Sequence, residues 1–131
     1  TEAPALCKYK GRYYLMGSGC TGWNPNPAHS SVATSIWGPW QDTGNPVRGI
    51  NPFNKKGPEE TFGGQSTFIL PVQGKPDLFI AMFDIWRPKN AIDGRYVWLP
   101  ITFTPEGRFE IHWQSEWTLE APFKQIQQAG K

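Results

Sequence analysis

Residues 78–114 read LFIAMFDIWRPKNAIDGRYVWLPITFTPEGRFEIHWQ, and this stretch decides the fold class. Apolar runs at 78–86 and 95–103 are each followed by a turn containing Pro and Gly, which is the pattern of strands joined by short connections. Residues 108–114 alternate apolar and polar side chains, and this period of two predicts a strand with one solvated face. A further apolar run at 65–72 precedes them. The stretch therefore predicts an antiparallel meander of four strands.

The beginning of the chain predicts a similar unit. Residues 4–9 and 12–18 predict a hairpin with Lys10-Gly11 at its turn, and residues 29–35 predict a third short strand. A fourth strand would complete a second four-stranded sheet. The sequence thus predicts an all-β fold of antiparallel four-stranded units.

The chain has 131 residues, a length that suits a single domain. We assign one four-stranded unit to about residues 1–43 and the second to residues 61–118. Between them, residues 44–60 are rich in Gly, Pro and Asn and predict a long loop, while residues 119–131 form a tail that could be helical or extended.

Two such units leave two architectures open. Four-stranded meanders are the blades of β-propellers, but a closed ring typically needs about four to eight blades. Two units therefore predict either about two blades of a larger propeller or two sheets packed face to face as a small sandwich.

Composition excludes several function classes. Thirteen basic against eleven acidic residues give a formal charge of +2, so we expect no nucleic-acid partner. We also expect no membrane span, because no apolar run reaches the length that one requires, and we expect no signal peptide, because no basic segment followed by an apolar run begins the sequence. Aromatic residues make up 15% of the chain, which favours a packed β-domain over disorder.

Cys7 and Cys20 do not face each other across the predicted hairpin, and we favour two free thiols without settling their disulfide status.

Three segments carry a resemblance to a known family. They are residues 2–40, containing EAPALCKY, YYLMGSGCTGWNPN and WGPW, residues 61–72, TFGGQSTFILPV, and residues 94–103, GRYVWLPITF. Together they resemble the C-terminal part of glycoside hydrolase family 43 (GH43), in the branch of the exo-β-1,3-galactanases. The similarity covers about residues 2–118.

This resemblance implies a fold and an activity. It implies about two blades of a five-bladed β-propeller whose pocket lies at one end of the central channel. It also implies inverting hydrolysis that removes terminal galactose, or less favourably arabinose or xylose, from plant polysaccharide. The family's general acid matches Glu2, and its pocket glutamine matches Gln65. The general base belongs to earlier blades without a counterpart here, so we expect the chain alone to be inactive.

The chemistry of Glu2 fits this role. Inverting hydrolysis needs an acid and a base on opposite faces of the sugar, roughly 6.5–9.5 Å apart. Glu2 precedes Ala3-Pro4, and proline biases the residue before it toward extended geometry, which would aim a carboxylate along a strand. The alternative interpretation is a solvated residue near the chain terminus.

Further residues are candidates for binding the sugar. Trp23 and Trp86 lie in loops after strands, where an exposed ring can stack on a sugar. Asp84 ends a buried strand, and Arg95 and Tyr96 begin the next one, so we predict that all three contribute polar groups to the pocket. The alternative for Asp84 is a structural role, capping the turn or pairing with Arg95.

The other tryptophans favour structural roles. Trp37 and Trp40 flank Gly-Pro and predict packing between sheets, whereas Trp98 and Trp113 lie in predicted strands and favour the core.

No cofactor is predicted, because His29 and His112 are too isolated in sequence to indicate a metal site. Whether a calcium ion binds in a propeller channel is left open.

The expected partners are an oligo- or polysaccharide substrate and either missing N-terminal blades or a second copy of the chain. The resemblance implies a secreted or periplasmic protein. Two alternatives remain: a non-catalytic carbohydrate-binding β-domain, and a structural half that completes a propeller.

Overall fold

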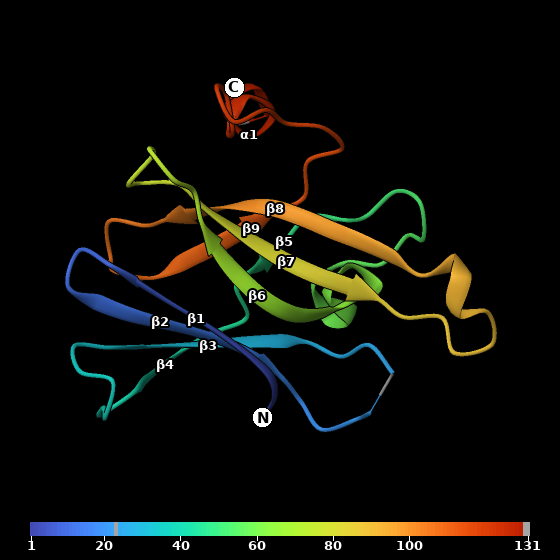
Figure 1. Cartoon of the computed structure of the whole chain (residues 1–131), viewed down its shortest axis with the longest axis horizontal. Helices are drawn as coiled ribbons and strands as arrows, with labels where there is room; N and C mark the ends of the chain where they lie inside the picture. Colours follow the sequence, from blue (N-terminus) through green and yellow to red (C-terminus); the bar gives the residue numbers. More distant parts are fainter. Residues whose placement is uncertain (23, 130–131) are drawn as a thin grey trace.

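Two sheets account for most of the molecule (Figure 1). The computed structural model describes residues 1–22 and 24–129. The first sheet is an antiparallel meander with the order β1-β2-β3-β4. Its strands are β1 (Glu2–Tyr9), β2 (Arg12–Ser18), β3 (Ala28–Ala33) and β4 (Gln41–Gly44).

The second sheet has five strands in the order β5-β9-β8-β7-β6. Four of them form an antiparallel meander, and the short β5 pairs in parallel with β9 at the edge. The strands are β5 (Val47–Arg48), β6 (Gln65–Pro71), β7 (Phe79–Ile85), β8 (Arg95–Phe103) and β9 (Phe109–His112). The prediction of antiparallel four-stranded units agrees with both sheets.

The described residues also form three short helices: the 3-10 helices η1 (Pro58–Gly63) and η2 (Ala91–Asp93) and the α-helix α1 (Lys124–Ala129). The predicted loop at 44–60 therefore contains β5 and the beginning of η1, and the tail contains α1. No helix among the described residues is long and apolar enough to cross a membrane.

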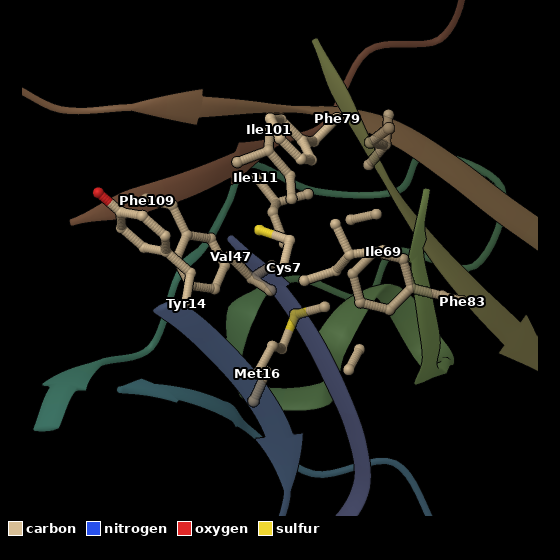
Figure 2. Close-up of a cluster of buried hydrophobic side chains, with 14 of the residues drawn as sticks. Cys7, Tyr14, Met16, Val47, Ile69, Phe79, Phe83, Ile101, Phe109 and Ile111 are labelled. Carbon is tan, nitrogen blue, oxygen red and sulfur yellow. The ribbon is translucent and has the colours of Figure 1, made fainter. Parts of the chain in front are cut away.

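One hydrophobic core lies between the two sheets (Figure 2). It forms because the strands alternate: in β1, Ala5 and Cys7 are buried while Leu6 and Lys8 are exposed. Figure 2 shows Met16 of β2 and Ile69 of β6 on the same cluster. The largest fully buried side chains include Phe62, Phe83, Met16, Ile69, Leu99, Ile101 and Ile111. Face-to-face packing is therefore present, as both a sandwich and neighbouring blades require.

Hydrogen bonds join the sheets near both ends of β1. At one end the Tyr9 hydroxyl donates to Asp77 Oδ1 over 2.7 Å. At the other, Ser66 Oγ donates to the Ala3 carbonyl over 2.6 Å. These bonds hold β1 beside β6, although the two strands are about sixty residues apart in sequence.

The longer loops gather at one end of both sheets. β1, β6 and β8 begin there, whereas β2 and β7 end there. The connections 19–27 and 86–94 and the helix η1 lie on the right of Figure 1, opposite the turns at residues 10–11, 72–78 and 104–108. We call the first end the loop end. It collects residues from both sheets, and the candidate site is built there.

Two sequence predictions about tryptophan are wrong. Trp37 is 91% exposed in the connection between β3 and β4, rather than packed between sheets. Trp98 is 50% exposed, because it lies on the outer face of β8 between the core residues Val97 and Leu99. The cysteines are both free thiols, with Cys7 buried and Cys20 exposed.

Candidate functional site

A cavity of about 260 Å³ lies at the loop end. Five of the predicted site residues line it: Gln65, Asp84, Trp86, Arg95 and Tyr96. They come from β6, β7, β8 and the loop after β7. Trp86 is 41% exposed and Tyr96 72% exposed, so both rings are accessible to a ligand.

Strand register explains how residues distant in sequence meet here. Glu2 faces Ser18 across β1 and β2, and Gln65 faces Asp84 across β6 and β7. Asp84 in turn faces Tyr96 across β7 and β8. The Gln65 side chain links the two sheets, because its Nε2 donates to Ser18 Oγ over 2.8 Å. A continuous row of polar residues therefore crosses both sheets at the loop end.

Gly64 sets how closely β6 approaches β7 beside the cavity. A Cβ atom at this position would lie 2.8 Å from the Asp84 carbonyl oxygen, closer than real side chains allow. The helix η1 just before it is fixed from the other side, since Thr61 Oγ1 donates to the Asn26 carbonyl over 2.6 Å. Gln65 therefore begins β6 directly after two constraints: the close backbone approach at Gly64 and the side-chain hydrogen bond of Thr61.

Side-chain hydrogen bonds of Asn26 brace the loop after β2. The Gly19 amide donates to Asn26 Oδ1 over 2.8 Å, and Asn26 Nδ2 donates to Thr21 Oγ1 over 2.6 Å. Asn24 and Asn26 also line the cavity. Trp23, the predicted sugar-binding residue of this loop, lies outside the described residues.

Charges at the rim are arranged differently from the sequence prediction. Arg95 pairs with Asp93 over 2.6 Å, and Arg87 pairs with the same carboxylate over 2.8 Å. The suggested pairing of Asp84 with Arg95 is therefore wrong: Asp93 is adjacent in the loop, and no described residue forms an ion pair with Asp84. These exposed pairs contribute little stability but close the loop between β7 and β8. Asp84 stays exposed at the cavity as an acceptor.

Glu2 lies in the first position of β1, opposite Ser18, and is half-buried. It is not among the residues that line the cavity. The expected extended geometry at Ala3 is wrong, because Ala3 has φ +52° within a register shift between Glu2 and Ala5. The hydrogen bond from Ser66 to the Ala3 carbonyl stabilises this bulge, and bulges re-aim neighbouring side chains.

Comparisons with solved structures find proteins that the chain resembles. The chain is 43% identical to a GH43 β-1,3-galactosidase solved with galactodeoxynojirimycin, over 90% of this chain and 32% of that one, with a TM-score of 0.79. The chain is related to the GH43 β-1,3-galactosidases. It is also 36% identical to an exo-β-1,3-galactanase from Clostridium thermocellum, over 84% of this chain and 23% of that one, with a TM-score of 0.67.

A third similar structure contains a bound oligosaccharide. A variant of an exo-β-1,3-galactanase from Phanerochaete chrysosporium, solved with β-1,3-galactotriose, is 31% identical over 83% of this chain and 23% of that one, with a TM-score of 0.65. The chain thus spans about a third to a quarter of the length of these relatives. No protein-family model and no curated protein matches the sequence.

The GH43-related chain also has a second, larger cavity of about 600 Å³. It lies along β8 and residues 113–117, with Trp98, Trp113 and Trp117 in its lining, and shares only Ile85, Arg95 and Tyr96 with the first cavity. Neither Gln65 nor Glu2 lines it. We therefore place the candidate site in the smaller cavity, which is lined by Gln65 and by Ser18, the residue that faces Glu2 across β1 and β2.

Sequence reasoning missed Ser18 and Asn26. Both are small polar residues at a strand end and in a loop, which are common positions for such residues. Their importance comes from contacts to Gln65 and Thr61, which are 47 and 35 positions away in sequence. The described residues contain no group of three or more His, Cys, Asp or Glu that could hold a metal ion.

Proposed function

We propose that this chain is the C-terminal part of a GH43 glycoside hydrolase that removes terminal galactose from plant polysaccharide by an inverting acid–base mechanism. Arabinose and xylose are the alternative sugars. The observation that carries the proposal is the convergence of Gln65, Asp84, Trp86, Arg95 and Tyr96 on one cavity beside the strand that begins with Glu2.

The cavity suits a single terminal sugar. Its volume of about 260 Å³ lies just below the range of about 300–1,000 Å³ typical of pockets for drug-sized ligands. Trp86 offers an apolar face for the C–H surface of a sugar ring, while Gln65, Asp84 and Arg95 offer hydrogen-bonding groups for its hydroxyls. An exo-acting enzyme needs this combination, since it binds the end of a chain.

Glu2 is the proposed general acid, protonating the leaving oxygen. In the proposal, the general base comes from further propeller blades, which join this chain as N-terminal sequence or as a separate polypeptide. The chain alone is then inactive. We also propose export from the cytoplasm, since a polymeric substrate lies outside the cell.

Exposed apolar side chains on the outer face of the second sheet support the proposal that another structural unit packs there. Its outer face exposes Phe68 (52%), Leu70 (39%) and Trp98 (50%), and the register places Phe68 and Trp98 on either side of Met82. Contiguous exposed apolar side chains mark interaction surfaces. This face suits the apolar face of a further blade, with a second copy of the chain as the alternative occupant.

Reconstitution tests the enzymatic proposal. The chain is co-expressed with the part of a GH43 β-1,3-galactosidase that it does not cover, and galactose release from β-1,3-galactan is measured. We expect activity to appear only in the combination and to fall about 10²–10⁴-fold in Glu2→Gln, as for loss of a general acid. Glu106→Gln, in the turn at the opposite end of the sheets, is the matched control and retains activity. Full activity of Glu2→Gln contradicts the assignment.

A non-catalytic carbohydrate-binding domain is the second candidate function. It is favoured by the fact that the described residues of this chain form the cavity without any partner. Galactose binding by the isolated chain, together with no hydrolysis in any reconstituted mixture, supports this candidate over the enzyme.

A further inference from the structure

Ser18 lies at the loop end between the strand of Glu2 and the side chain of Gln65. It is the last residue of β2, is 5% exposed, lines the cavity and faces Glu2 across the ladder. Its hydroxyl contacts two candidate residues: Gln65 Nε2 lies 2.8 Å from Ser18 Oγ, and the Glu2 carbonyl oxygen lies 3.4 Å from it. One buried hydroxyl therefore connects the strand of the proposed acid to the glutamine of the pocket.

The single proton of Ser18 gives its two contacts different directions. A serine hydroxyl carries one proton and can accept through its lone pairs, whereas a carbonyl oxygen only accepts. Because Gln65 Nε2 donates to Ser18 Oγ, the Ser18 proton is left for the Glu2 carbonyl, and both contacts are satisfied at once. The opposite orientation of the Gln65 amide would place Oε1 against Ser18 and leave the Glu2 carbonyl without this proton.

The backbone of Ser18 is itself held. His29 Nε2 lies 3.3 Å from the Ser18 carbonyl and 3.4 Å from Thr1 Oγ1. Since a carbonyl only accepts, this ring nitrogen carries the proton. The hydroxyl of Ser18 thus projects from a strand end that is paired with β1, paired with β3 and tied by a side chain.

We propose that Ser18 is a positioning residue that orients the Gln65 amide, so that Nε2 is engaged by Ser18 and Oε1 is left as the hydrogen-bond acceptor offered to the ligand. No described residue donates to Gln65 Oε1. The ligand group that meets it must be a donor, which is a sugar hydroxyl or a water bound beside the sugar. This inference rests on the proposed sugar-binding function of the cavity.

The test measures the NMR signals of the Gln65 side-chain amide. Gln65 side-chain amide signals are recorded by ¹H–¹⁵N NMR in the whole chain and in Ser18→Ala and Ser18→Thr. We expect Ser18→Ala to shift the Gln65 NH₂ signals and to speed their exchange with solvent, and Ser18→Thr, which keeps the hydroxyl, to restore the original pattern. Unchanged Gln65 signals in Ser18→Ala overturn the proposal, and this readout needs no ligand.

Galactose titration then tests the consequence for binding. We expect Ser18→Ala to weaken galactose binding about three- to tenfold, the effect of one misplaced hydrogen bond. Ser18→Thr restores the affinity, which a merely structural contact would not require. If Ser18→Ala moves the amide signals but binds galactose as the original chain does, the acceptor role of Gln65 is wrong.

A measurement on the original chain covers the case in which Ser18→Ala does not fold. If Ser18 Oγ accepts from Gln65 Nε2, the Gln65 NH₂ protons show NOE contacts to the Ser18 β protons, as the 2.8 Å separation of Nε2 and Oγ requires. Absence of these contacts, with the NH₂ signals exchanging as fast as those of a solvated amide, overturns the proposed orientation. If the original chain binds no galactose at all, the proposed function fails, while the amide signals still decide whether Ser18 orients Gln65.

Discussion

Cys7 lies in the core between the sheets, and burial raises the pKa of its thiol from 9.0 to about 12. Cys20 is exposed at the end of the molecule where the cavity lies. The thiolate is the reactive form of cysteine, so the two residues should differ strongly in reactivity.

We predict that iodoacetamide at pH 8 modifies Cys20 in the folded chain, whereas Cys7 reacts at least about 100-fold more slowly until the protein unfolds. Peptide mass spectrometry measures both rates in one sample, with Cys20 as the internal control. Equal rates for the two cysteines contradict the packing of β1.

The same shift predicts a pH dependence of stability. The folded state holds the Cys7 proton more tightly than the unfolded state, so this contribution to stability is complete below pH 9. It declines as the pH rises from 9 toward 12. Burial also raises the pKa of Tyr14, which acts in the same direction. Chemical denaturation across this range, compared with Cys7→Ala, measures the effect, and an identical alkaline decline in the variant contradicts it.

Residue contacts were only partly predictable from sequence. The row of candidates along β6, β7 and β8 follows from strand ends, and Asp84 and Tyr96 lie opposite each other as adjacent antiparallel strands require. The partner of Arg95 was not predictable, because the choice between Asp84 and Asp93 depends on how η2 turns the loop. Ser18 was missed since its bond to Gln65 joins two different sheets.

At the scale of elements, Gly64 allows the start of β6 to lie close to the end of β7 beside the cavity. We predict that Gly64→Ala, whose Cβ would meet the Asp84 carbonyl at 2.8 Å, costs about 1–3 kcal/mol and weakens galactose binding, because β6 must move away from β7. Thermal or urea unfolding and galactose titration measure the two effects.

Gly74→Ala is the matched control for this substitution. Gly74 lies between the same two strands at their other end, has φ +81° and leaves open space for a Cβ atom. Its substitution costs stability through backbone strain alone. Galactose binding should therefore remain unchanged in Gly74→Ala, and equal losses of binding in both variants contradict the role of Gly64.

Long patterned strands were the predictable elements. Residues 12–18 and 95–103 form β2 and β8 with the expected bounds, because apolar runs between turn residues specify them locally. The short strand β5 was not predicted, since its two residues take their strand geometry from pairing with β9, about sixty positions later. The bulge at Ala3 was likewise set by Ser66, a contact between sheets.

At the scale of the whole molecule, the outer face of the second sheet exposes large apolar side chains, including Phe68 and Trp98. We predict that the double substitution Phe68→Ser and Trp98→Ser lowers association of the chain with the remainder of a GH43 relative at least about tenfold, since exposed aromatic residues dominate interfaces. Analytical ultracentrifugation measures this, together with any self-association.

Ile92→Ser is the control for that prediction. Ile92 is 96% exposed in η2, away from the outer face of β6 and β8. Association should be unchanged in this variant. If the double variant associates as tightly as the original chain, the outer face is not the packing surface.

Architecture at this scale was predictable only in part. Strand count and turn spacing predicted antiparallel meanders, and the two sheets confirm a mostly β chain with few helices. Sequence pattern could not choose between a sandwich and neighbouring blades, because both bury one face of each sheet. The exposed Trp98 was assigned to the core for the same reason: a pattern shows which residues share a face, not what covers that face.

We propose above all that the cavity at the loop end binds a terminal galactose. Backbone ¹H–¹⁵N spectra of the chain titrated with galactose test it most directly. We expect saturable shifts at Ser18, Gln65, Asp84 and Tyr96, with loss of these shifts in Gln65→Ala. Saturable shifts confined to residues 113–117 of the larger cavity, or no shifts at any galactose concentration, contradict it.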